Sequence, residues 1–162
     1  GRTMVKREIP DATEGGFLDA ELPPREVAAQ KVGRALAGWI DEHHYRSSGG
    51  VRVLRDRTTV VVYWKGTVPA GLRSLAARQP VPVTFTPVPY SLDELNTAID
   101  AVIANNPGIV SVIGSVPDRS AVSVALYSTA PPDAFAQLKA RAGTNVPIVF
   151  RGIIDPIPLG GD

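Results

Sequence analysis

Three consecutive side chains that could bind a metal ion stand at one point of the chain: Glu42, His43 and His44. Imidazole and carboxylate groups are common zinc ligands. Adjacent residues of a helix point about 100° apart, however, so the two imidazoles would not meet on one ion. Asp41 and His44 have helical spacing but no third ligand near them in the sequence. We therefore interpret the histidines as exposed at a helix end, and we expect no metal.

Basic side chains around a short turn are the second group with possible chemistry. The cluster and its aromatic neighbours are Arg46, Arg52, Arg55, Arg57 and Lys65 with Tyr63 and Trp64. A sheet that carries aromatic residues on an open face can bind RNA. Here Trp64 falls on the buried side of its strand, and no RNP-type sequence occurs. Charges solvated at a turn explain the cluster more simply, so we expect no nucleic acid partner.

Catalytic motifs are absent from the sequence. It has no G-x-S-x-G, no P-loop and no G-x-G-x-x-G. It also has no cysteine, which excludes thiolate catalysis, disulfides and cysteine-bound metals. The adjacent carboxylates Asp93 and Glu94 are explained by a helix N-terminus, where negative charge is favoured. We predict a protein without enzyme activity, catalytic residues or a cofactor.

Composition sets wide limits. The chain has 162 residues, of which 44% are hydrophobic and 20% charged, with a net charge of +1. Residues 1–79 hold 13 Lys and Arg against 9 Asp and Glu, whereas residues 80–162 hold 4 against 7. No apolar run is long enough for a membrane span, and the start has no apolar core of a signal peptide. The compartment stays open, and would be extracytoplasmic if the chain is a fragment of a secreted or envelope protein.

The order of periodic segments predicts two halves between two tails. We expect a flexible tail over residues 1–22, a first half over 23–90, a second half over 91–151 and a C-terminal tail over 152–162. Alternation and helical spacing predict the elements. The expected helices are 23–42, 69–80, 91–105 and 132–142, and the expected strands are 51–54, 58–64, 81–88, 109–115, 121–127 and 146–150.

One stretch occurs twice, as Asp56–Gly71 and, 62 residues later, as Asp118–Asp133. Its strand carries large apolar groups at matching alternate positions, which predicts the buried face. The matching residues are Val60, Val62 and Trp64 with Val122, Val124 and Leu126.

The repeat predicts an α+β fold. Two repeated β-α-β units would form a ferredoxin-like sheet shared by both halves, with helices packed on one face and an additional N-terminal helix. Chance similarity between two generic β-α-β stretches is the alternative.

The other face of the repeated strand differs between the copies. The first copy has Val61 and Tyr63 where the second has Ser123 and Ala125. An apolar sheet face of this kind is normally covered. Either the chain's own N-terminal helix packs there, or a partner protein does.

From about Val83 onward the chain resembles the pro-regions of secreted bacterial serine proteases of the alpha-lytic protease and streptogrisin type, and related stand-alone actinobacterial domains. The resemblance rests on the segments Tyr90–Leu95, Gly108–Val112, Asp118–Val124, Pro131–Ala142 and Val146–Phe150. Ser120 and Ala121 depart from the family, which often has an asparagine at that turn. No protease follows in this sequence.

The resemblance implies that the chain binds a protein as a folding assistant or inhibitor, with a serine protease as the candidate partner. It implies that strand 146–150 pairs with the enzyme and that residues 152–162 enter its cleft. The alternative is a central strand followed by a tail without a role. The candidate partner-binding residues are Val61, Tyr63, Val146, Ile148, Phe150, Gly152, Ile153, Ile154, Pro156 and Pro158.

Two other functions stay open. One is a structural or sensory module of an envelope protein, in which the repeat is purely architectural. The other is an RNA-binding sheet, which the buried position expected for Trp64 disfavours. The sequence leaves the partner and the oligomeric state undetermined.

Overall fold

A computed structural model of the chain describes residues 4–8, 23–43, 45–54 and 58–155. The chain divides into two compact units. The first unit comprises residues 11–93, and the second unit comprises residues 94–162 together with 1–10. In the described part, the fold is α+β with four helices and two mixed sheets.

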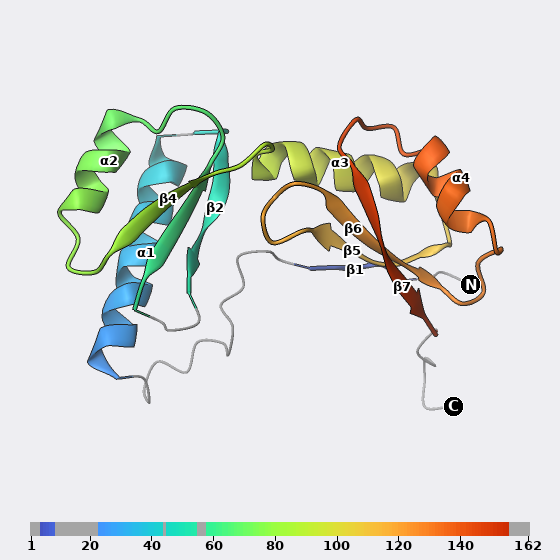
Figure 1. Cartoon of the computed structure of the whole chain (residues 1–162), viewed down its shortest axis with the longest axis horizontal. Coiled ribbons are helices and arrows are strands. Elements are labelled where there is room, and N and C mark those ends of the chain that lie inside the picture. The colour runs from blue at the N-terminus through green and yellow to red at the C-terminus, as the bar shows by residue number, and fades with distance from the viewer. Residues whose placement is uncertain (1–3, 9–22, 44, 55–57, 156–162) are drawn as a thin grey trace. The chain divides into compact units, whose positions relative to one another are not determined.

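The first unit is a three-stranded sheet with two helices. Its elements are α1 (Pro24–Glu42), β2 (Ser48–Val53), β3 (Val60–Trp64), α2 (Ala70–Ala77) and β4 (Val83–Pro87). The strand order is β2-β3-β4, antiparallel between β2 and β3 and parallel between β3 and β4. Both helices lie on the same face of the sheet (Figure 1).

The core of the first unit lies between those helices and β3. From α1, the residues Val32, Leu36 and Ile40 are buried at a spacing of four, which places them on one side of the helix. They belong to the same cluster as Trp64 of β3 and Leu72 of α2. Pro24 begins α1, where its missing N–H costs nothing.

The second unit repeats this plan and adds one short strand. Its elements are β1 (Lys6–Arg7), α3 (Leu92–Asn105), β5 (Val110–Ser115), β6 (Val122–Tyr127), α4 (Ala134–Ala140) and β7 (Ile148–Ile154). The strand order is β1-β5-β6-β7, and only β5 and β6 are antiparallel. Helices α3 and α4 lie over one face of this sheet (Figure 1). Arg7 of β1 forms an ion pair with Asp100 of α3 at 2.8 Å.

The two units agree in detail. Each runs helix, strand, strand, helix, strand. Each also has a register shift at the same place in its hairpin, between Ser48 and Gly50 in β2 and between Val110 and Val112 in β5. The buried face expected from the repeat is confirmed, because the six alternate residues of β3 and β6 are almost fully buried.

The expectation of one shared sheet is wrong, since the structure has two separate sheets. In each unit the central strand already has a neighbour on both sides. The last strand of each unit therefore lies at the edge of that unit's own sheet, β4 in the first unit and β7 in the second. Each strand–helix–strand unit is thus part of a different sheet.

The boundaries of the expected tails also differ from the structure. Lys6 and Arg7, within the expected N-terminal tail, form strand β1 beside Val112 and Ile113 of β5. At the other end, β7 continues to Ile154, past the expected boundary at Gly152. The pairing of Leu126 with Ile153 and of Tyr127 with Ile154 extends β7, because β6 offers backbone partners up to Tyr127.

The turn between β5 and β6 is held by Asp118. Its Oδ1 accepts a hydrogen bond from Ser120 N at 3.0 Å and one from Ser120 Oγ at 2.5 Å. These bonds lower the pKa of the Asp118 carboxyl below its ordinary value of 3.8. The next residue, Arg119, has a φ of 60°, a left-handed conformation that the turn imposes on it.

Asp118→Ala should lower the free energy of unfolding at pH 7 by about 0.5 kcal/mol, the low end for a hydrogen bond because the carboxylate is exposed. A lowered folded-state pKa contributes stability above the unfolded value, and this contribution is lost as the pH falls through the folded value. The difference between wild type and Asp118→Ala, measured by urea unfolding, should therefore shrink below about pH 4. Asp118→Asn is the control, since it keeps an acceptor but cannot titrate. A difference that is constant from pH 7 to pH 2.5 would contradict this account.

Helices α1 and α2 approach closely at Gly71. A Cβ atom on Gly71 would lie 2.9 Å from Cζ2 of Trp39, whereas one on Gly38 of α1 would meet nothing within 4 Å. Trp39 is held from its other side by the ring of His43, at a centroid distance of 3.9 Å. The indole therefore has little freedom to move away from α2.

Substitution of two helical glycines by alanine should change the stability of the protein in opposite directions. Gly71→Ala should destabilise the protein by about 1 to 3 kcal/mol through overpacking against Trp39. Gly38→Ala should stabilise it by about 0.4 to 1 kcal/mol, because alanine reduces the entropy of the unfolded chain. Urea or thermal unfolding measures both. Equal effects of the two variants would show that the Trp39 contact does not limit the packing of α2.

Candidate functional site

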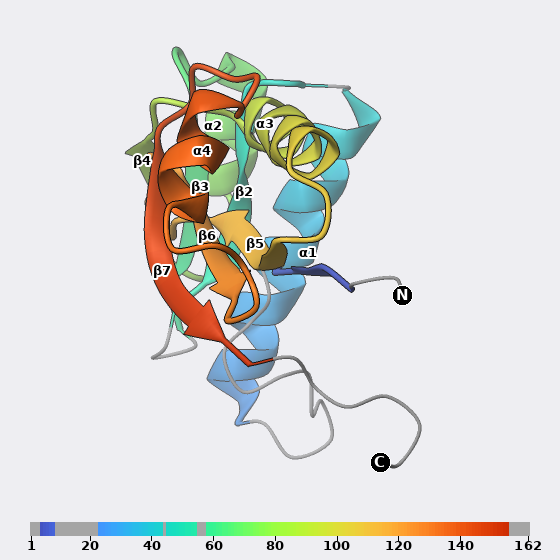
Figure 2. The same cartoon turned by 90° about the vertical axis from the view of Figure 1, so that its right-hand side faces the viewer.

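Strand β7 lies at one end of the second unit's sheet among the strands of the described residues (Figure 2). It is seven residues long and contains no proline. Sheet edges carry unpaired backbone groups that can pair with another chain, and long apolar edges are the most exposed to such pairing. Among the described strands, β7 is therefore an edge strand and not a central one.

The register of β7 determines which of its backbone groups face outward. Val122 N of β6 donates to Pro147 O at 2.9 Å, and Val122 lies opposite Ile148. In a parallel ladder, one residue bonds to the two neighbours of its opposite residue. Pro147 and Val149 therefore face β6, while Ile148 and Phe150 direct their N–H and C=O groups away from the sheet.

The side chains of β7 leave much apolar surface uncovered. The exposed fractions are 47% for Val149, 44% for Phe150, 58% for Ile153 and 38% for Ile154. Only two other described large hydrophobic residues, Met4 and Tyr45, are as exposed. Of the six, four are on one strand, so the exposure is concentrated and not scattered.

Phe150 is directed to the helix side of the sheet. It lies opposite Val124, which is on the buried face, and its ring is 5.0 Å from that of Phe135 in α4. Lys139 Nζ lies 5.5 Å from the centre of the Phe135 ring. The contact with α4 therefore supports Phe150 from one side and leaves the other side open.

A bulge interrupts β7 at Arg151. Val124 and Ala125 of β6 lie opposite Phe150 and Gly152, so Arg151 is the extra residue. Gly152 has a φ of 139°, which a residue with a side chain rarely adopts. Arg151 Nη1 lies 2.6 Å from Glu8 Oε2, so its charge is paired within the second unit. Bulges of this kind limit uncontrolled edge pairing, and they leave Ile148–Phe150 and Ile153–Ile154 as two short pairing segments.

Val61 and Tyr63, whose sheet face was expected to be covered by the N-terminal helix or by a partner, are not exposed. Both are buried and pack with Val88 and the partly buried Leu54. The expectation that the N-terminal helix covers them is also wrong, because α1 packs with α2 on the opposite face, against Val60 and Val62. The sequence showed the apolar residues of both α1 and β3. The alternation along β3 does not determine which of its two faces α1 packs against.

The other predicted residues divide between buried and exposed positions. Val146 is buried before β7 begins, and Ile148 and Gly152 are half-buried. Phe150, Ile153 and Ile154 are exposed, as a binding surface requires. Pro156 and Pro158 lie outside the described residues.

Two residues with notable positions in the structure were not predicted from the sequence. Val149 is an exposed β7 residue that a strand expected to end at Phe150 did not single out. Arg119 is fully buried although it is in a turn, and its Nη1 donates to Pro117 O at 2.5 Å. A charged residue in a turn between two strands is normally predicted to be exposed to solvent. Only the three-dimensional structure therefore identifies Arg119 as part of the interior.

Among the described residues, the side chains considered for metal or catalytic chemistry do not converge, and His44 lies outside these residues. His43 stacks on Trp39, and its Nδ1 is 2.8 Å from Trp39 O. The described residues contain no group of three His, Cys, Asp or Glu side chains that could hold a metal ion. Within the same residues, no helix is both long and apolar enough to cross a membrane.

Comparison of the sequence with models of known protein families finds no match, and comparison with curated protein sequences finds none either.

Proposed function

We propose that the chain is a non-enzymatic protein-binding domain whose β7 edge pairs with an extended segment of a partner protein. The observation that carries this proposal is the concentration of exposed Val149, Phe150, Ile153 and Ile154 on an edge strand. Main-chain hydrogen bonds would supply affinity, and the alternating side chains would supply specificity. The outward backbone groups of Ile148 and Phe150 are available for the first part of this pairing.

The partner we propose is a secreted serine protease of the chymotrypsin type, which the resemblance to protease pro-regions implies. The chain would then act as a folding assistant or inhibitor, or as a stand-alone descendant with another partner. We also propose that the two units arose from one ferredoxin-like repeat. Their common element order and their matching register shifts support this origin.

An inhibition assay tests the proposal. The chain should inhibit alpha-lytic protease or chymotrypsin with an inhibition constant in the micromolar range or below. Ile153→Lys should weaken inhibition by about tenfold or more, because a lysine on an edge strand opposes pairing and costs at least ~1.4 kcal/mol of binding energy. Ile153 is well exposed, so thermal unfolding of the variant should be unchanged.

Thr84→Lys is the matched control, since Thr84 is an exposed residue of β4, the corresponding edge strand of the first unit. It should inhibit as the wild type does. Amide hydrogen exchange at Phe150 should also slow when the protease is bound. Absence of inhibition by the wild type would reject the protease partner, and equal inhibition by Ile153→Lys would reject the β7 edge.

An architectural role in an envelope protein is the alternative, and the close agreement of the two units favours it as a second candidate. A purely architectural repeat predicts that no protease changes the hydrogen exchange of β7. It also predicts that Ile153→Lys has no effect on any protein interaction.

A further inference from the structure

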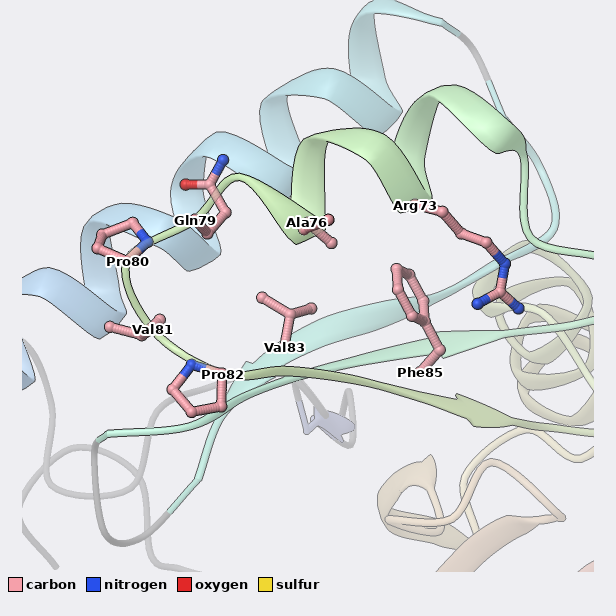
Figure 3. Close-up of a pocket in the computed structure, with 9 residues that line it drawn as sticks. Arg73, Ala76, Gln79, Pro80, Val81, Pro82, Val83 and Phe85 are labelled. Atoms are coloured by element: carbon pink, nitrogen blue, oxygen red, sulfur yellow. The ribbon is translucent and has the colours of Figure 1, made fainter.

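A groove in the first unit lies between α2 and β4 and has a volume of about 600 Å³. This size is within the usual range for small-molecule and peptide sites. Figure 3 shows Val83 and Phe85 of β4 pointing toward α2, with Ala76 above them. Gln79 and Pro80 close one end of the groove, and Arg73 stands at the other. Most of the lining side chains are therefore apolar, polar atoms make up about half of the lining surface, and one cation stands at an end.

The second unit has larger side chains at two positions that line this groove. A shift of 62 residues, which places Trp64 on Leu126, also places Arg73 on Phe135 and Ala76 on Leu138. Leu138 is fully buried in the second unit. The first unit has an alanine at that position, and this alanine lines the groove. Its own buried leucine, Leu72, lies one turn earlier in the helix, where the second unit has Ala134.

The second difference concerns the phenylalanine of the last strand. Phe85 lies opposite Val62, and Phe150 lies opposite the matching Val124, so the two phenylalanines correspond. The Phe135 ring packs on Phe150 at 5.0 Å, whereas the guanidinium of Arg73 lies 5.2 Å from the Phe85 ring centre. The helix of the second unit therefore places an apolar ring, Phe135, against the phenylalanine of its last strand. The helix of the first unit places a cation, Arg73, over the matching ring.

The charge of Arg73 is available to a ligand. In the part of the chain that the structure describes, no carboxylate forms an ion pair with Arg73. Arginine binds carboxylates through two parallel hydrogen bonds, and it does so best beside an apolar surface that lowers the local dielectric. The groove thus combines apolar lining side chains with a carboxylate-binding group at its mouth.

The backbone of β4 adds a third element. Val60 N donates to Pro82 O at 3.0 Å, and Val60 lies opposite Val83. By the parallel-ladder rule, Val83 and Phe85 direct their N–H and C=O groups away from β3. Pro87, the next outward position, has no N–H. Pairing along β4 is therefore restricted to a short segment directly beside the groove.

We propose that this groove binds the carboxyl terminus of an extended peptide. The peptide runs parallel to β4, because Arg73 stands beside Phe85, at the end of the strand beyond Val83. Its backbone pairs with Val83 and Phe85, an apolar side chain occupies the space between Ala76 and β4, and its terminal carboxylate binds Arg73. This site is in the first unit and does not rest on the function proposed for β7.

Fluorescence anisotropy with defined peptides tests the site on the full chain. The probes are three fluorescein-labelled pentapeptides that end in valine, leucine or phenylalanine, each made with a free carboxylate and with a terminal amide. At least one free acid should bind saturably below about 1 mM, and its amide should bind about tenfold more weakly because the charge-assisted pair with Arg73 is lost. No saturable binding by any free acid would overturn the proposal.

Three variants separate the contribution of the Arg73 charge to peptide binding from that of the space beside Ala76. Arg73→Gln should weaken the free acid about tenfold and leave the amide unchanged. Ala76→Leu should abolish binding of both forms, because Ala76 lines the groove and a leucine there takes up part of its volume. Arg78→Gln is the control on an exposed arginine at the end of α2, and it should have no effect. Thermal unfolding checks that each variant is folded. If Ala76→Leu does not fold, the effect of Arg73→Gln alone decides whether the groove binds the peptide.

Other results would identify a different ligand or site. Equal affinity of acid and amide, or no effect of Arg73→Gln, would overturn the role of Arg73. If decanoate binds and no peptide does, the groove is a site for small amphiphilic carboxylates and the peptide proposal is wrong. Ile153→Lys should not change peptide binding, which keeps a failure of this proposal distinguishable from a failure of the proposed β7 function.

Discussion

Parallel pairing between the central strand and the last strand is the constraint on which each unit depends. A parallel neighbour can be reached only by a crossover, and here the crossover contains a helix, α2 or α4. The helix must then cover one face of the sheet. Since the central strand is already paired with its hairpin partner, the last strand takes the edge position. Each unit consequently ends in an edge strand with a helix beside it.

That arrangement places the two proposed sites at corresponding positions. The β7 edge and the α2–β4 groove both lie where a last strand meets the crossover helix. Their side chains then differ. Phe135 and Leu138 pack the second unit tightly, whereas Arg73 and Ala76 line a groove in the first unit. One backbone plan can therefore present an apolar edge in one unit and a charged groove in the other.

The two edges are also protected to different degrees. Strand β4 is five residues long and ends in Pro87, which cannot donate a hydrogen bond. Strand β7 is seven residues long and is interrupted only by the bulge at Arg151. Proline limits pairing by removing a donor, and a bulge limits it by breaking the ladder. A partner of β7 thus has more backbone to pair with than a partner of β4.

The sequence by itself determined the periodicity and the repeat. Alternation along Val60–Trp64 and Val122–Leu126 identified the buried face of both central strands, because apolar side chains must leave water wherever they lie in the chain. Capping residues, prolines and glycines located the helices to within a few residues. The resemblance to protease pro-regions singled out Phe150 and Ile153 as binding residues, and both are exposed in the structure.

Only the tertiary structure decided which surfaces meet. It placed α1 and α2 on the same face, buried Val61 and Tyr63, and divided the strands between two sheets. It also opened the groove at Ala76, which is an ordinary helical alanine in the sequence. The physical reason is that periodicity is a local property of one segment. The choice of partner for each apolar face depends on the free energy of packing all segments together.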